Sequence, residues 1–342
     1  MSTSTKAYAQ AGVDIDLGNS LKGGLGQALA STHRPEVLGK VGGFGGLFLA
    51  SFGAMQEPVL VSSIDGVGTK LRLALALDRH DTVGQDLVNH CVNDIAVLGA
   101  RPLFFLDYIG TGKLEPPVFT AILSGLAAAC RAAGCALIGG ETAQMPGIYH
   151  GWDYDLVGCI VGVVDRARMV DGSRIEPGDV VIGLPSSGLH TNGYSLAREI
   201  LFNRMGLTPE SRPEELGGAS LGDVLLAVHR PYLETMARLP EGMLKGAAHI
   251  TGGGLIDNLP RVLPEGCAAV IDTKSWTVPP IFRFIQRGGQ VPEEEMYQVF
   301  NMGVGMGLVV SAADADAALT ILGTEAARIG HIEGGERRTR LA

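Results

Sequence analysis

The residues from Asp65 to Lys70, "DGVGTK", combine groups that attract phosphate with one that repels it. Gly66 and Gly68 let backbone N–H groups approach an anion closely, and Lys70 supplies a positive charge. Asp65 stands directly before Gly66, where its negative charge would repel a bare phosphate. A divalent cation removes this conflict, because Mg²⁺ binds one or two carboxylates together with substrate phosphates. The loop therefore predicts a site for a metal–nucleotide complex.

The two common nucleotide-binding loops do not fit this stretch. A P-loop places its lysine directly after the last glycine, whereas Thr69 separates Gly68 from Lys70. The dinucleotide fingerprint G-x-G-x-x-G also fails, because Leu71 takes the place of the third glycine. A plain turn is the alternative, in which Asp65 only accepts hydrogen bonds from neighbouring N–H groups.

Further carboxylates follow in two separate segments. Asp86, His90 and Asp94 recur every four residues, so they share one face of a helix. A solvated polar stripe is the ordinary explanation, but Asp94 interrupts an apolar run and therefore predicts a side chain that points into a pocket. Glu141 ends the strand "CALIGG", and open α/β sheets bind ligands at the carboxyl ends of strands. Asp65, Asp94 and Glu141 are thus the three predicted ligands of one Mg²⁺.

In the second half, two loops place a histidine beside small residues just before a helix. "LPSSGLHTNGYS" contains His190 and Asn192, and "HITGGG" contains His249 and Thr251. The free N–H groups of a helix start bind anions, and histidine carries protons near neutral pH. A cap or a surface position would explain either histidine alone. The repetition of the pattern favours a site for a phosphorylated substrate.

Strands and helices alternate in both halves, which predicts an α/β or α+β fold. Strands are expected at 58–65, 102–110, 135–140, 153–165, 180–184, 267–273 and 303–312, and helices at 81–100, 116–134, from 194, 255–262 and 280–287. A charged, turn-rich stretch at 166–176 marks the boundary between the halves. We therefore expect a glycine-rich arm at 1–50, a nucleotide-binding domain at 51–170 and a substrate-binding domain at 171–342.

Composition limits the functional classes. The 342 residues suit two domains of roughly 100–200 residues each. A net charge of −9 argues against a nucleic-acid binder, which usually presents a basic face. The five cysteines include no Cys-x-x-Cys pair, which indicates reduced thiols in a cytoplasmic protein. An apolar run of about 20 residues, as needed to span a membrane, is not found.

Several long segments resemble one enzyme family, the aminoimidazole ribonucleotide synthetases or phosphoribosylformylglycinamidine cyclo-ligases. They follow the same order from about Tyr8 to Gly330: "SSIDGVGTKLRLA", "HCVNDIAVLGARPLFFLDYIGTGKL", "IGGETAQMPGIYHGWDYDLVG", "SSGLHTNGYSLAREIL", "HITGGGLIDNLPRVLP" and "MYQVFNMGVGM". The resemblance implies that formylglycinamidine ribonucleotide and ATP yield aminoimidazole ribonucleotide, ADP and phosphate in purine biosynthesis. ATP would phosphorylate the formyl oxygen to an iminophosphate, and a nitrogen of the same molecule would then close the ring.

The resemblance also implies a role for each candidate residue. The metal ligands would be Asp65, Asp94 and Glu141. The contacts to ATP and phosphate would be Gly66, Gly68, Thr69, Lys70, Asn192 and Thr251. The catalytic side chains would be Lys70, Asp94, His190 and His249.

The family fold pairs a small sheet of the first domain with its twin across a homodimer, with a second α/β domain behind it. The arm at 1–50 would cover the nucleotide and would be poorly ordered without it. One position departs from the family pattern, because Gly26 stands where relatives often carry a lysine. We expect Lys22, about one helical turn earlier, to substitute for that lysine.

Related ATP-using families share the "DG-x-G-T" theme and are the competing interpretations. A selenophosphate synthetase is disfavoured because the first 90 residues contain no cysteine. A thiamine-phosphate kinase should lack the loops of His190 and His249, and formylglycinamidine synthetase needs a far longer chain. A non-catalytic nucleotide-binding regulator would bind ATP without turning it over.

Overall fold

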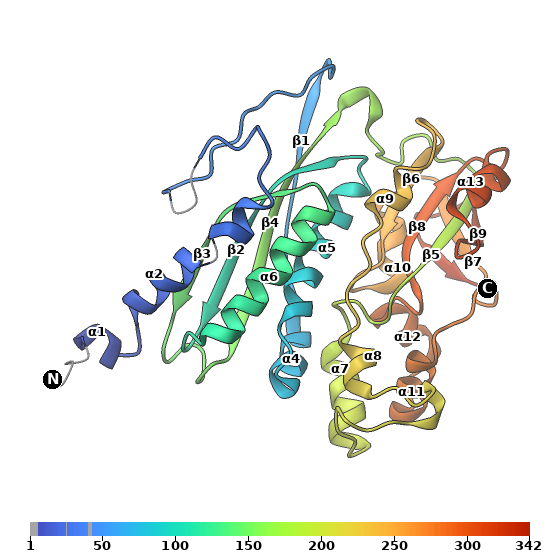
Figure 1. The fold of residues 1–342 in the computed structure, drawn as a ribbon. Coiled ribbons are helices and arrows are strands. Elements are labelled where there is room, and N and C mark those ends of the chain that lie inside the picture. Colours follow the sequence, from blue (N-terminus) through green and yellow to red (C-terminus); the bar gives the residue numbers. More distant parts are fainter. Residues whose placement is uncertain (1–5, 25, 40–42) are drawn as a thin grey trace.

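The first half of the chain builds a four-stranded sheet covered on one face by two long helices (Figure 1). The computed structural model describes residues 6–24, 26–39 and 43–342, without the side chains of residues 22 and 23. The strands are β1 (Pro58–Gly66), β2 (Arg101–Thr111), β3 (Ala136–Gln144) and β4 (Tyr154–Asp165), in the order β1-β4-β2-β3. Only the β2–β3 pair is parallel among these neighbours. The sheet therefore places β1 and β3 at opposite edges.

The covering helices are α5 (Asp81–Ala96) and α6 (Pro116–Ala132), which cross at two glycines. A Cβ atom on Gly84 would lie 2.3 Å from the carbonyl oxygen of Ile122, and one on Gly125 would lie 2.2 Å from that of Asp81. The backbones can approach this closely only because neither glycine carries a side chain. A 3₁₀ turn, η1 (Gly68–Lys70), and a short helix, α4 (Leu71–Leu77), connect β1 to α5.

The second half forms a six-stranded sheet in the order β10-β7-β9-β5-β8-β6. Its strands are β5 (Val180–Pro185), β6 (Leu244–His249), β7 (Cys267–Ile271), β8 (Val304–Val310), β9 (Ala327–Gly334) and β10 (Thr339–Leu341). All its paired neighbours are antiparallel except β10 and β7. The mixed α/β architecture predicted from the alternation is confirmed, although both sheets are mainly antiparallel.

Short helices surround this second sheet. The α-helices are α7 (Tyr194–Arg198), α8 (Leu221–Leu225), α9 (Leu233–Met236), α10 (Gly254–Asn258), α11 (Pro280–Gly289), α12 (Glu293–Val299) and α13 (Ala315–Leu322). Shorter helical turns are η2 (Arg166–Arg168), η4 (Glu214–Leu216) and η5 (Leu259–Arg261), and η3 (Glu199–Arg204) is a π-helical continuation of α7. The segment "LKGAAH" was not predicted as a strand, because its small residues lack the β-branched side chains that signal one.

The N-terminal arm contains helices that the sequence did not predict: α1 (Ala7–Gln10), α2 (Ile15–Gly24) and α3 (Gly26–Ala30). The arm is anchored beside β3, where the Thr32 hydroxyl accepts the Leu137 N–H at 2.9 Å. It thus lies at the sheet edge opposite β1 (Figure 1). The backbone of Lys22 belongs to α2, but its side chain lies outside the described part of the structure, so its proposed substitution for a lysine at Gly26 stays a prediction.

Helix α5 joins the two domains through its polar face. Asn89 donates to the carbonyl of His229 at 2.7 Å. Asn93 donates to the carbonyl of Arg230 at 2.9 Å and accepts the N–H of Tyr232 at 2.9 Å. Asp86 and His90, two residues of the stripe that resembled a solvated helix face, are buried at this junction, whereas Asp94 stays partly exposed.

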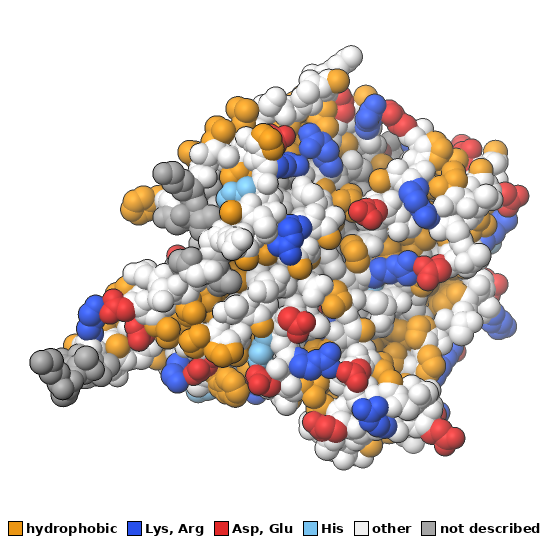
Figure 2. Space-filling view, viewed as in Figure 1, with side chains coloured by type: hydrophobic (Ala, Val, Ile, Leu, Met, Phe, Trp, Pro, Cys, Tyr) orange, Lys and Arg blue, Asp and Glu red, His pale blue; other side chains and the backbone are white. Residues whose placement is uncertain are grey.

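The outer surface carries charged side chains of both signs among hydrophobic ones on the face shown in Figure 2. Within the described residues, no helix combines the length and apolar character needed to cross a membrane.

Candidate active site at the domain junction

A cavity of about 440 Å³ opens where β1 and α5 of the first domain meet β6 and α10 of the second. Its polar lining includes Asp65, His90, Asp94, His249, Thr251 and Arg261. The end of β1 supplies Asp65, the C-terminal half of α5 supplies His90 and Asp94, and the end of β6 supplies His249. The structure thus brings four predicted site residues, Asp65, Asp94, His249 and Thr251, from both domains to one cavity.

Two carboxylates converge on one imidazole in this cavity. His90 Nε2 lies 2.8 Å from Asp65 Oδ2 and 3.8 Å from Asp94 Oδ2. Asp94 also accepts a hydrogen bond from the Ser63 hydroxyl at 2.9 Å. Burial alone would raise the pKa of both carboxyl groups, but their contacts with histidines outweigh it and lower each pKa. Burial would likewise lower the pKa of His90, but the hydrogen bond to Asp65 and the two negative charges leave it raised.

Asp65 also accepts the N–H of Gly66 at 2.6 Å. This is the local turn contact that formed the alternative explanation of the loop. The same side chain reaches His90 through its other oxygen, so the turn contact and the site contact occur together.

Glu141 does not join these carboxylates within one chain, contrary to the expectation of a shared ion. In the sheet register, Asp65 pairs with Gly158 of β4, which pairs with Asp107 of β2, which pairs with Gly140 of β3. Three inter-strand steps correspond to about 14 Å, too far for two ligands of one ion. Local sequence patterns predict where strands end but not the order of strands in the sheet. The expectation that Glu141 shares an ion with Asp65 and Asp94 is therefore wrong within one chain.

Lys70 is also not placed as expected. Its side chain is fully buried, with Nζ 2.8 Å from Asp86 Oδ2 and donating to the carbonyl of Ala227 at 2.7 Å. Burial lowers the pKa of Lys70 and raises that of Asp86, and the attraction between the two charges opposes both shifts. The ammonium is enclosed by protein, so in this structure it does not face a phosphate.

The rest of the glycine loop contacts the second domain. Gly68 has a φ of +69°, which favours glycine, and the Thr69 hydroxyl lies 3.0 Å from that of Ser195. Asn192 donates to the Thr191 hydroxyl at 3.4 Å. The loop of Asp65–Lys70 and the loop of His190 are therefore neighbours, although 120 residues of sequence separate them.

Four histidines pack together, with His90 and His249 in the cavity lining and His190 and His229 behind it. The His190 ring stacks on that of His229 with centroids 4.0 Å apart, and His229 lies 5.2 Å from His90 and 5.1 Å from His249. Burial and the neighbouring imidazoles lower the pKa of His190 and His229 well below the usual value. Burial also lowers the pKa of His249, against the opposing effect of Asp94. His190 itself is only 1% exposed and its Nε2 accepts the Ser187 N–H, so it lies behind the cavity wall.

His229 is not among the site residues predicted from the sequence. It lies in "AVHRPY", outside any glycine-rich loop and outside the periodic helices. A histidine beside an arginine and a proline, without a recognisable pattern around it, is a weak signal, and only the fold shows that it is fully buried at the site.

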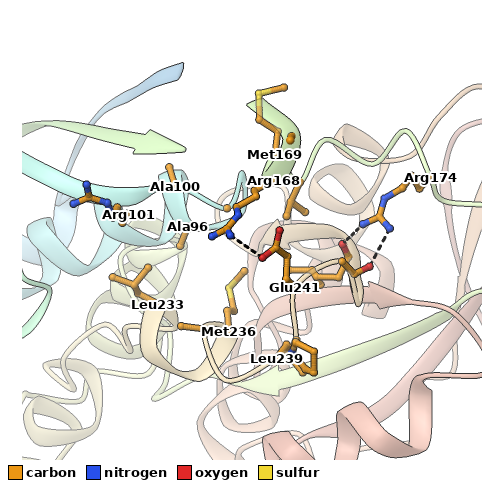
Figure 3. Close-up of a pocket in the computed structure, with 17 residues that line it drawn as sticks. Ala96, Ala100, Arg101, Arg168, Met169, Arg174, Leu233, Met236, Leu239 and Glu241 are labelled. Atoms are coloured by element: carbon orange, nitrogen blue, oxygen red, sulfur yellow. Dashed lines mark hydrogen bonds and ion pairs between the residues drawn. The ribbon is translucent and has the colours of Figure 1, made fainter. Parts of the chain in front are cut away.

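A second cavity, of about 680 Å³, lies between the end of α5, the 166–174 linker and α9 (Figure 3). Its lining is largely apolar, including Ala96, Leu233 and Met236. Two of its arginines are already engaged: Arg168 pairs with Glu241 at 3.0 Å, and Arg174 donates to two backbone carbonyls. The smaller cavity, with its paired carboxylates, is therefore the candidate active site.

Comparison with known proteins agrees with this assignment. Residues 51–164 match the family model "AIR synthase related protein, N-terminal domain", and residues 176–341 match "AIR synthase related protein, C-terminal domain". The chain belongs to the AIR synthase family. Phosphoribosylformylglycinamidine cyclo-ligases from Anaeromyxobacter dehalogenans and Trichlorobacter lovleyi are 54% and 52% identical to it. The alignments cover 96% and 97% of this chain and 96% of each relative.

More distant AIR synthase-like folds occur among solved structures. Thiamine-monophosphate kinase from Stenotrophomonas maltophilia aligns with a TM-score of 0.66 at 19% identity, over 92% of this chain and 94% of that chain. Hydrogenase maturation protein HypE in complex with ATP aligns with a TM-score of 0.65 at 19% identity, over 97% of this chain and 88% of that chain. At this identity the likeness establishes the fold and leaves the substrate to other evidence.

Proposed function

We propose that this enzyme is an ATP-dependent cyclo-ligase that converts formylglycinamidine ribonucleotide to aminoimidazole ribonucleotide, with release of ADP and phosphate. One observation carries the proposal: the cyclo-ligase relatives share more than half of the residues over nearly the full length of the chain. The paired carboxylates at the domain junction give that activity a site with suitable chemistry. The five free cysteines fit a reducing cytoplasm as its location.

The proposed reaction activates a poor leaving group. The formyl oxygen attacks the γ-phosphorus of ATP, so that ADP leaves and an iminophosphate forms on the substrate. A nitrogen of the same molecule then attacks the activated carbon, loses a proton and expels phosphate, which closes the ring. Because both reacting groups belong to one molecule, correct orientation can remove up to roughly 7–11 kcal/mol of the barrier. The protein must therefore orient the substrate, exclude water and accept a proton.

Asp65 and Asp94 are the residues we propose to hold Mg²⁺ with the ATP phosphates. Both carboxylates are kept ionised by their histidine contacts and both line the same cavity, which suits an ion that prefers oxygen ligands. When bound, the ion would neutralise charge on the transferring phosphoryl group. Arg261 and Thr251, which the second domain contributes to the cavity lining, would contact phosphate oxygens of the substrate.

A homodimer is the proposed assembly, formed through the sheet face that α5 and α6 leave uncovered. On β1, Leu60 and Ile64 alternate with residues that face α5, and they are 62% and 68% exposed. Large aliphatic side chains exposed on one sheet face indicate a contact surface. A second copy of the chain would cover them.

Product analysis tests the proposed reaction. With formylglycinamidine ribonucleotide and Mg-ATP, we expect ADP and phosphate in a one-to-one ratio with aminoimidazole ribonucleotide. ATP binding without turnover would instead support a regulator. Phosphorylation of thiamine monophosphate would instead support a kinase like the structural neighbour from Stenotrophomonas maltophilia.

A further inference from the structure

We propose that His229 is a positioning residue of the site, whose Nε2–H fixes His249 in the tautomer that donates a hydrogen bond to Asp94. His229 does not line the cavity and is fully buried behind it. It would therefore act on the reaction only through His249 and Asp94. Its effect on turnover rests on the proposed cyclo-ligase function, whereas its effect on the tautomer of His249 does not.

The backbone of His229 is held from both sides by α5. Its N–H donates to Asp86 Oδ1 at 2.7 Å, and its carbonyl accepts from Asn89 at 2.7 Å. Its ring is stacked on that of His190 at a centroid distance of 4.0 Å and an interplanar angle of 20°. The backbone hydrogen bonds and the ring stacking together fix the positions of its two ring nitrogens. A side chain can orient a neighbour only if its own position is fixed in this way.

The proton positions follow from the carboxylate end of the network. His249 Nδ1 lies 2.8 Å from Asp94 Oδ1, and an ionised carboxylate can only accept, so Nδ1 carries the proton. In a neutral imidazole the other nitrogen, Nε2, then has a lone pair and no hydrogen. His229 Nε2 lies 3.0 Å from His249 Nε2, so His229 must be the donor in this contact.

The other end of the network agrees with this assignment. With its proton on Nε2, His229 accepts at Nδ1, where the Thr191 hydroxyl lies 3.4 Å away. Thr191 in turn lies 2.8 Å from His90 Nδ1, and His90 Nε2 reaches Asp65. A series of polar contacts thus joins the two cavity carboxylates, with hydrogen bonds from Asp94 as far as His90 and an ion-pair contact from His90 to Asp65.

A transition-metal site is the competing explanation, since ligand atoms of His190, His229 and His249 lie within 4.8 Å of one another. The contacts favour the hydrogen-bond network. His190 Nε2 already accepts the Ser187 N–H at 3.1 Å, and its ring is stacked nearly parallel to that of His229. Two rings stacked in this way do not direct lone pairs at one ion, and His249 Nδ1 is engaged by Asp94.

If a substitution removes the Nε2–H donor of His229, the proton of His249 can move from Nδ1 to Nε2. Its Nδ1 lone pair would then face the Asp94 carboxylate, and two acceptors would be in contact. Asp94 would move or bind a different partner, and the cavity would lose the position of one of its two carboxylates. We therefore expect slower turnover with little change in the affinity for formylglycinamidine ribonucleotide.

The test compares two amide replacements that differ in which imidazole nitrogen they imitate. In His229→Gln the side-chain amide can occupy the place of Nε2 and still donate to His249. In His229→Asn the shorter side chain reaches only the place of Nδ1. His331→Asn, on the exposed part of β9, is the matched control. Histidine-selective ¹⁵N NMR of the full chain without nucleotide identifies the protonated nitrogen of His249.

We expect an unprotonated His249 Nε2 in the wild-type protein and in His229→Gln, and a changed tautomer in His229→Asn. In the cyclo-ligase assay we expect kcat to fall about 10–100-fold in His229→Asn, a loss typical for partners that orient site residues. KM for formylglycinamidine ribonucleotide should change little, and His229→Gln should recover most of the rate. The same His249 tautomer in all variants would overturn the proposal. So would equal losses of kcat in both variants, or a stoichiometric transition metal in the wild-type protein that is absent from His229→Asn.

If the wild-type protein shows no cyclo-ligase turnover, the proposed function fails but the NMR comparison still decides the role of His229. Thermal unfolding of each variant controls for loss of fold.

Discussion

Single charged side chains at this site divide into those that face the cavity and those that hold the domains together. Asp94 is partly exposed and faces the cavity, whereas Lys70 and Asp86 are fully buried as a pair. The motif "DGVGTK" alone cannot separate these roles, because a lysine after a glycine turn suits either a phosphate or a buried carboxylate. The deciding information is that Asp86, sixteen residues further along the chain, lies beside Lys70 in the fold.

The buried pair predicts a double-mutant result. Lys70→Met leaves Asp86 as an unpaired buried charge, which should lower the free energy of unfolding by about 3–5 kcal/mol. Adding Asp86→Leu should recover much of this loss, because both charges are then replaced by apolar groups. Urea unfolding of the two single variants and the double variant measures the coupling. A Lys70→Met protein of unchanged stability but weaker ATP binding would instead support the phosphate contact first expected.

At the scale of elements, the helices and strands were more predictable than their arrangement. Helix α5 was expected from its apolar periodicity, and β1, β2 and β4 from their β-branched and aromatic residues. Strand order could not be predicted, because local patterns carry no information about which strands pair. The structure brings Asp65 and Asp94 to one cavity, whereas Glu141 lies on a strand at the opposite edge of the sheet.

The polar face of α5 should stabilise the domain junction. Asn93→Leu removes the partner of two buried backbone groups, at Arg230 and Tyr232, at a cost of about 1–3 kcal/mol for each. Gln85→Leu on the same helix is the control, because its amide bonds only to an exposed carbonyl of the helix itself. Chemical denaturation should show a large loss for the first variant and a small change for the second. Similar losses in both variants would contradict this view of the junction.

The α5–α6 crossing predicts a contrast between two helical glycines. Gly84→Ala should cost about 1–3 kcal/mol, because its Cβ would meet the Ile122 carbonyl at 2.3 Å and the helices must separate. Gly18→Ala, in α2, has nothing within 4 Å of the new Cβ and should stabilise by roughly 0.5–1 kcal/mol. Melting temperatures of the two variants should therefore shift in opposite directions. A Gly84→Ala protein with an unchanged melting temperature would show that the crossing is not tight.

At the scale of the whole molecule, the site exists only because two domains meet. β1 and α5 supply the carboxylates, β6 supplies His249, and a loop of the second domain supplies His229. Local sequence patterns indicate the loops on both sides but not this contact between domains, since no local pattern connects residues 139 positions apart, such as Asn93 and Tyr232.

The exposed face of the first sheet predicts the assembly state. Leu60→Lys should convert the proposed homodimer to a monomer in sedimentation velocity, because a charge would replace an apolar contact. Ile15→Lys, also at an exposed aliphatic residue but in the arm, should leave the sedimentation coefficient unchanged. A monomeric wild-type protein would contradict the dimer proposal.

We propose that ATP-dependent ring closure takes place in the junction cavity, and Asp94→Asn is the sharpest test of this site. With formylglycinamidine ribonucleotide and Mg-ATP, we predict that this variant forms ADP and aminoimidazole ribonucleotide about 10²–10³-fold more slowly than the wild-type protein, because the ion that stabilises the transferring phosphoryl group would lose a charged ligand. Asp316→Asn, the same change at an exposed position of α13, should retain full activity. Wild-type rates in Asp94→Asn, or ATP turnover in the wild-type protein that does not depend on formylglycinamidine ribonucleotide, would contradict the account.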